Sequence, residues 1–138
     1  IKFVKILINM FYKKKIKSCK ILNFHKGYAP FFLPIFYDKK FFRITKKIFT
    51  DCLLAEGIPL GSNYGCLVSN WNWANKYLKS KFKSLNAIKT RDDCFHLYLN
   101  ENYKLKEAKD IVNAILKIEK FYAEIKYSST RKIYKRKN

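Results

Sequence analysis

Apolar residues recur at intervals of three and four along two stretches of the chain, a period typical of amphipathic helices. Between residues 105 and 125, eight apolar positions keep this spacing, and lysines fall mostly on the opposite face. A second helix is predicted over residues 41–56, where Gly57 and Pro59 form a stop signal. Glycine adopts the left-handed conformation after a last helical turn without steric cost, so we expect Ile58 to fold back onto this helix.

Short apolar runs predict strands between these helices. The strongest run covers residues 31–37, and Pro34 within it cannot donate a ladder hydrogen bond. We therefore expect this strand at a sheet edge or with an irregularity at Pro34. Further strands are predicted over residues 19–24 and 95–99, and shorter helices over 1–17, 74–82 and 86–91. Strands that alternate with helices indicate an α/β or α+β fold.

The length of 138 residues suggests one domain, and 49% apolar residues suffice for a core. We divide the chain into a basic segment with a partial helix (1–27), a folded domain (28–125) and a basic tail (126–138). We expect this tail to be disordered. Because no Met stands at position 1, we expect the chain to begin inside a longer reading frame.

No apolar run approaches the roughly 18 residues that span a bilayer, so we expect no contact with a membrane. The apolar start of the chain precedes its lysines, which is the reverse of the order in a signal peptide. The four cysteines do not form a CxxC motif, and none of them is separated from a histidine by the spacing typical of metal ligands. We interpret them as reduced thiols in the cytoplasm and expect no metal site.

The net charge of +20 is concentrated at the two ends of the chain. Residues 1–27 and 126–138 contain fourteen basic and no acidic residues, which leaves +6 for the middle. A nucleic-acid-binding protein gathers its charge on a folded face. We therefore interpret the charge as a compositional bias of a lysine-rich chain, and keep a basic nucleic-acid-binding module as the alternative function.

Catalytic motifs are absent from the sequence. The four glycines fit neither a dinucleotide-binding nor a phosphate-binding loop, and there is no nucleophile elbow. Cys94 and His96 would share one face of a strand, where a Cys–His nucleophile pair is conceivable. We favour the interpretation that they form one face of a half-buried strand.

Several polar and aromatic residues are candidates for ligand binding. Trp71 and Trp73 could stack on a base or a sugar, although we favour a position covering the core. Arg91 lies at an element boundary, and its planar guanidinium suits a carboxylate or phosphate better than lysine does. Loops carry ligand contacts more often than element interiors do. The candidate substrate-binding residues are Ser62, Asn63, Tyr64, Asn86 and Arg91.

An ordered set of short motifs resembles one enzyme family. The first half of the set is Phe32-Leu33-Pro34-Ile35, Leu53-Leu54-Ala55-Glu56-Gly57-Ile58-Pro59-Leu60, Tyr64 and Leu67-Val68-Ser69-Asn70-Trp71-Asn72-Trp73-Ala74. The second half is Asn86-Ala87, Arg91-Asp92, Phe95-His96-Leu97-Tyr98-Leu99-Asn100-Glu101-Asn102-Tyr103 and Asp110-Ile111-Val112-Asn113-Ala114-Ile115-Leu116-Lys117-Ile118-Glu119. Over residues 28–123 the chain resembles the C-terminal region of the DegT/StrS-type aminotransferases.

The resemblance implies the small C-terminal domain of a fold-type-I enzyme, with a small, mostly antiparallel sheet packed against helices. Such enzymes use pyridoxal phosphate to transfer an amino group, commonly from glutamate, to a nucleotide-linked keto sugar. No lysine of this chain stands in the family's Ser-Phe…Lys…Gly-Glu-Gly context. The resemblance therefore implies a fragment without a catalytic residue, completed by an N-terminal part or paired as a homodimer. A truncated, inactive gene product is a further alternative.

Overall fold

The computed structural model describes residues 2–22, 30–41, 44–77 and 83–135. Its helices and strands follow one another along the chain in the order predicted, with shorter boundaries at several places. In chain order they are α1 (Lys2–Lys14), β1 (Cys19–Ile21), β2 (Phe32–Tyr37), α2 (Lys46–Ala55), β3 (Leu60–Gly61), the 3-10 helices η1 (Val68–Asn70) and η2 (Ala74–Tyr77), α3 (Leu85–Asp93), β4 (Cys94–Tyr98) and α4 (Leu105–Lys135).

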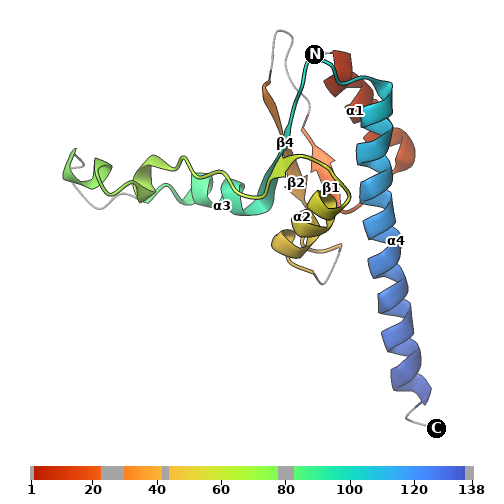
Figure 1. The fold of residues 1–138 in the computed structure, drawn as a ribbon. Coiled ribbons are helices and arrows are strands. Elements are labelled where there is room, and N and C mark those ends of the chain that lie inside the picture. Colours follow the sequence, from red (N-terminus) through yellow and green to blue (C-terminus); the bar gives the residue numbers. More distant parts are fainter. Residues whose placement is uncertain (1, 23–29, 42–43, 78–82, 136–138) are drawn as a thin grey trace.

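The described strands form one antiparallel sheet in the order β1-β2-β4-β3. Helices α1, α2 and α4 contribute buried residues to a single core cluster with this sheet. This architecture confirms the predicted α+β class with a small antiparallel sheet packed against helices. Figure 1 shows α4 as a long rod beside the sheet, extending well beyond it.

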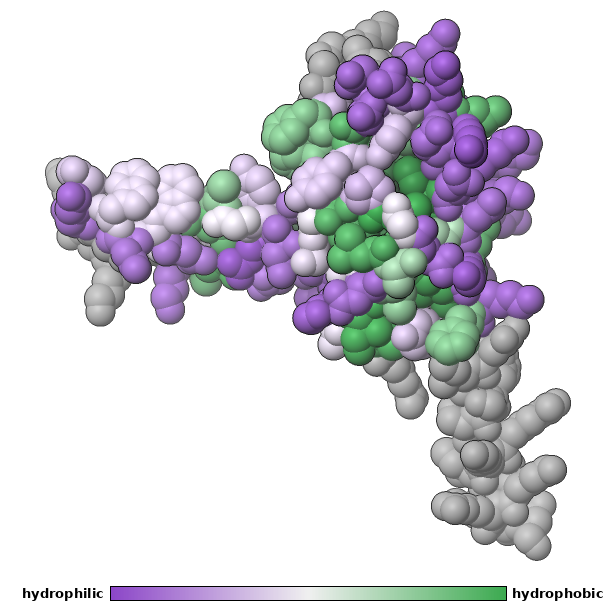
Figure 2. Space-filling view, in the orientation of Figure 1, coloured by the Kyte–Doolittle hydropathy of each residue, from purple (hydrophilic) through white to green (hydrophobic). Residues whose placement is uncertain are grey.

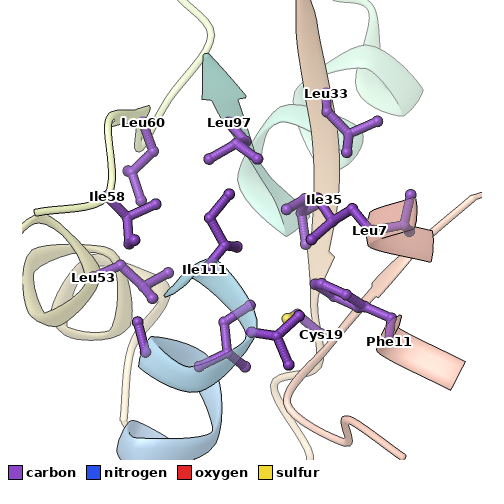
Figure 3. Packing of buried hydrophobic residues seen from close by; sticks show 14 of the residues in the cluster. Leu7, Phe11, Cys19, Leu33, Ile35, Leu53, Ile58, Leu60, Leu97 and Ile111 are labelled. Atoms are coloured by element: carbon purple, nitrogen blue, oxygen red, sulfur yellow. The ribbon is translucent and has the colours of Figure 1, made fainter. Parts of the chain in front are cut away.

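One face of the sheet supplies the strand contribution to the core. The register pairs Leu33 with Leu97 and Ile35 with Phe95, and all four side chains are at most 1% exposed. Alternate residues of a strand point to opposite faces, so these residues share the face that the helices cover. Figure 3 shows side chains from the helices and strands meeting there. The helix residues in this layer include Phe3, Leu7, Phe11, Phe49, Leu53, Ile111, Val112, Ile115 and Ile118.

The N-terminal segment belongs to this core. Helix α1 packs against α4, and Leu7 of α1 is fully buried. The carboxylate of Glu119 on α4 accepts hydrogen bonds from the backbone N–H groups of Lys17 (2.8 Å) and Ser18 (2.6 Å). Helix α1 and strand β1 of the basic segment 1–27 therefore pack in the same core cluster as the helices and strands of residues 28–125.

Helix α4 also differs from the prediction. It continues to Lys135, whereas the apolar pattern ended at Ile125 and the following residues were expected to be disordered. Helical backbone needs only hydrogen bonds along its own axis, so it can continue past the last packed turn. Residues 136–138 of the predicted tail lie outside the described residues.

Strand β2 occupies an inner position in the sheet, so the expected edge position is wrong. Pro34 faces His96 of β4 in the register. The backbone bond from Leu99 N–H to the carbonyl of Phe31 fixes which pairs exchange hydrogen bonds, and Pro34–His96 is not one of them. The backbone nitrogen of Pro34 therefore faces the side of β1. Because β1 ends with Ile21, opposite Ile35, no ladder hydrogen bond is needed there.

Two helices end in the same backbone motif. After α2, the N–H of Ile58 bonds to the carbonyl of Leu53 (3.0 Å) and that of Gly57 to Leu54 (2.9 Å). Gly57 has a φ of 82°, and Ile58 and Leu53 are both buried, so the predicted stop signal is confirmed. Lys15 takes the corresponding position after α1 with a φ of 53°.

Substitutions at these two positions are expected to change stability in opposite directions. Gly57→Ala places a Cβ in the left-handed region and should lower the free energy of unfolding by about 1 kcal/mol. Lys15→Gly removes that strain and should raise it by roughly 0.5–1 kcal/mol. Urea denaturation of the purified variants measures both changes.

Gly65→Ala is the matched control. A Cβ at Gly65 meets nothing within 4 Å, as at Gly57, but no positive φ is found there. A loss at Gly65 equal to that at Gly57 would contradict the backbone argument.

Candidate functional site

The described residues 62–77 and 83–93 form an arm between β3 and β4. Figure 1 shows η1, η2 and α3 projecting from the sheet on the side away from α4. Both ends of this arm return to neighbouring strands, since Leu60 pairs with Leu97 and Gly61 with His96. The base of the arm is therefore the place where residues distant in sequence meet.

The amine of Lys46 lies at this base and joins both ends of the arm. Its Nζ donates to Oδ1 of Asn63 (2.9 Å) and to the backbone carbonyls of Arg91 (2.8 Å) and Cys94 (2.8 Å). Lys46 is the first residue of α2, which begins at the Thr45 cap, where the Thr45 hydroxyl accepts from the N–H of Ile48. The first turn of α2 thus holds the ammonium in place, and we call this contact the Lys46 clamp.

The acceptors of the Lys46 clamp are neutral oxygens. Burial lowers the pKa of Lys46, the charges of Cys94 and Asp92 oppose that shift, and Arg91 and Lys39 reinforce it. An ammonium has three protons to donate, and the clamp uses all three. The geometry therefore suits a charged, structural lysine.

Of the predicted substrate-binding residues, some lie at the Lys46 clamp and others lie away from it. Asn63 and Arg91 are brought together by Lys46, and Ser62 lies half-buried beside Asn63 in the chain. The guanidinium of Arg91 is engaged with Asp92, through Nε and a terminal nitrogen at 2.9 Å each. Asn86 lies near the start of α3, roughly 12 Å of helix away from Cys94, and is exposed.

Tyr64 belongs to an aromatic group on the other face of the sheet. Its ring lies 5.6 Å from that of His96 and 5.9 Å from that of Phe32, and Phe32 lies 5.1 Å from His96. A Cβ at Gly61 would stand 2.8 Å from the hydroxyl of Tyr98 and 2.9 Å from His96. A larger residue than glycine would therefore force the side chains of Tyr98 and His96 to shift where β3 crosses these rings.

Cys94 and His96 share one face of β4, as predicted, and both are 6% exposed. Burial raises the pKa of Cys94, although Lys46 opposes this shift, and burial together with the charge of Lys46 lowers the pKa of His96. A nucleophilic pair needs a thiolate, which a raised thiol pKa disfavours. The interpretation as one face of a packed strand is supported.

The tryptophans do not cover the core, contrary to the favoured interpretation. Trp71 and Trp73 stack on each other with ring centroids 5.3 Å apart and planes 27° apart, and neither belongs to the core cluster. Trp73 is 60% exposed. Nothing in the local spacing distinguished an outward arm from a loop folded over the core.

Within the part of the chain that the structure describes, no three His, Cys, Asp or Glu side chains could hold one metal ion. The four cysteines are free thiols. No described helix combines the length and the apolar character needed to cross a bilayer.

Lys46 is the residue that sequence reasoning missed, because nothing in its neighbourhood in the chain marks it among the other lysines. Comparison with known proteins adds no relative: no protein-family model and no curated protein matches the chain. The contacts at the Lys46 clamp are therefore the basis for assigning a function.

Loss of the Lys46 clamp is expected to destabilise the fold. Lys46→Met should lower the free energy of unfolding by about 2 kcal/mol, since bonds from a charged donor are lost and two carbonyls are left unpaired. Lys47→Met is the matched control, because Lys47 is exposed and its ion pair with Asp51 should contribute under about 0.5 kcal/mol. Equal losses for both variants, measured by urea denaturation, would refute the clamp.

Acidification is expected to destabilise the protein through His96. The folded pKa lies below the ordinary value of 6.5, so the unfolded chain binds the proton first as the pH falls. Stability should therefore fall as the pH drops through 6.5 towards the folded pKa. Urea midpoints at about pH 7.5 and 5.5 measure this change, and His96→Phe should flatten it. An unchanged slope in this variant would place the titrating group elsewhere.

Proposed function

We propose that the chain is the smaller, C-terminal portion of a pyridoxal-phosphate-dependent aminotransferase that acts on a nucleotide-linked keto sugar in the cytoplasm. The resemblance over residues 28–123 is the starting point. The observation that supports it is that the side chain of Asn63, a loop candidate, and the backbone carbonyl of Arg91, a residue of the motif set, meet at the Lys46 clamp. Another portion of the enzyme holds the cofactor and performs the chemistry.

The Lys46 clamp does not fit the role of an aldehyde-binding lysine. A Schiff-base lysine needs a free amine with a lone pair. Lys46 instead donates to Asn63, Arg91 and Cys94, and breaking these bonds would open the base of the arm. The contacts of Lys46 therefore support a proposal in which this lysine does not hold the cofactor.

The part assigned to this chain is to cover and shape a substrate pocket. An open hollow lies beside the clamp, lined by Tyr37, Lys39, residues 44–47 and Asp92. Its lining combines lysines with hydroxyl and carboxylate groups, which suit a sugar or an amino-acid donor. We assign Asn63, which Lys46 contacts, as a hydrogen-bonding group beside this hollow and Arg91 as the residue that positions Asp92.

The outer face of the sheet offers a surface for the remaining portion of the enzyme or for a second copy. Phe32, Pro34 and Phe36 share this face and are half-buried. Helices α1, α2 and α4 all contribute to the core on the opposite face. An apolar sheet face of this kind gains stability when a partner covers it.

The isolated chain is expected to bind no pyridoxal phosphate covalently and to catalyse no transamination. Mixing it with the cofactor should give no internal aldimine band near the visible edge, and borohydride reduction should add no cofactor mass. Adding glutamate and a nucleotide-linked keto sugar should give no turnover. A reducible adduct on one lysine that disappears in Lys46→Met would overturn both the proposal and the structural role of Lys46.

The DNA directly upstream of the codon for Ile1 gives an independent test. An open frame that encodes a lysine in the family's Ser-Phe…Lys…Gly-Glu-Gly context supports the proposal. An upstream frame that encodes an unrelated protein contradicts it.

A further inference from the structure

The arm carries aromatic rings that the fold itself does not cover. Trp73 is 60% exposed and Tyr77 is 71% exposed, with their ring centroids 6.5 Å apart. Trp71 stacks beneath Trp73, so the pair presents a flat face. Asn70 and Asn72 alternate with the indoles and are exposed, which places amide donors and acceptors next to the rings.

The sequence of the arm is basic. It contains six basic residues, and its two acidic residues, Asp92 and Asp93, stand at the base, where they pair with Arg91 and Lys39. Lys76, Lys83 and Lys89 are exposed and form no ion pair with the described residues, and Nζ of Lys76 lies 5.0 Å above the ring of Tyr77. Figure 2 shows the arm as pale surface beside strongly hydrophilic surface, away from the apolar patches of the main body. Rings and unpaired lysines therefore lie within one projecting element.

The polar amides between the rings and the net positive charge of the arm restrict the kind of partner that it can bind. A second copy of the arm would be repelled by its own charge. Insertion into lipid would bury Asn70 and Asn72 without partners. Single-stranded nucleic acid supplies unstacked bases for the rings, base edges for the amides and phosphates for the lysines. Duplex DNA keeps its bases stacked and cannot use the rings.

We propose that the arm is a binding surface for single-stranded nucleic acid, with Trp73 and Tyr77 stacking on bases and Lys76, Lys83 and Lys89 contacting phosphates. This activity does not depend on the aminotransferase proposal, because it uses the outer part of the arm and not the Lys46 clamp.

The test uses the full chain and a labelled oligothymidylate of about 12 nucleotides, a length within the usual site sizes. Binding should weaken steeply with salt and quench tryptophan fluorescence. Trp73→Ala should weaken binding about tenfold, whereas Trp73→Phe should retain most of it. Phe121→Ala is the matched control, because Phe121 is also an exposed ring, at 57%, but lies on α4.

A charge series separates the arm from the overall positive charge. Replacing Lys76, Lys83 and Lys89 with glutamine should reduce the slope of log affinity against log salt by about 2. The same replacement at Lys5, Lys13 and Lys109 removes equal charge from exposed positions of α1 and α4, and should leave the slope nearly unchanged.

Three outcomes would overturn the proposal. The first is equal slopes in the two lysine variants, which would mean non-specific attraction to the whole chain. The second is binding of a duplex as tight as that of the single strand. The third is binding to anionic phospholipid vesicles that depends on Trp73 while the oligonucleotide binds independently of it, which would assign the arm to a membrane surface.

Discussion

Burial of one sheet face beneath three helices is the constraint on which the rest of this fold depends. Helices α1 and α4 come from opposite ends of the chain, yet Leu7 and Val112 are both fully buried in the same layer. Each such side chain contributes about 1.5–3 kcal/mol when it leaves water, so the layer holds the termini together. The two hydrogen bonds to Glu119 then fix the chain as it passes from α1 into β1.

The helices α1, α2 and α4 occupy one face of the sheet, and residues 62–77 and 83–93 project from the sheet as the arm (Figure 1). A loop of this length loses conformational entropy when its ends are joined. The β3–β4 pairing and the Lys46 clamp both act at this junction, where Asn63 lies at one end of the arm and Cys94 follows the other. Burial, and to a smaller extent the charge of the same ammonium, lowers the pKa of His96 on β4.

The sequence predicted those features that depend on local chemistry. The stop at Gly57, the helical stripe from Leu105 and the β2 run each follow from a few consecutive residues. Features that depend on which strands pair with each other could not be predicted from consecutive residues. The inner position of β2 was not predicted. Pro34 is tolerated there because β1 ends before the position opposite it, and this depends on the strand register.

The candidate site was predicted in part for the same reason. Asn63 and Arg91 were identified by residue type at element boundaries, and the fold brings both to one point. Lys46 was not identified from the sequence. Its role depends on three hydrogen-bond acceptors, and two of these are backbone carbonyls, which have no sequence signature. Asn86 was selected by the same reasoning as Arg91 but lies along the arm, because it stands near the start of α3.

The composition of the chain explains the lysines of the arm, but it does not explain the position of its tryptophans. A lysine-rich bias explains why the arm is basic, and it would give lysines to almost any exposed loop of this chain. It does not explain why the indoles of Trp71 and Trp73 stack outside the core, when burial of either would stabilise the fold. The apolar area of Trp73 that the fold leaves exposed can still be buried by a partner, and its burial would then favour binding.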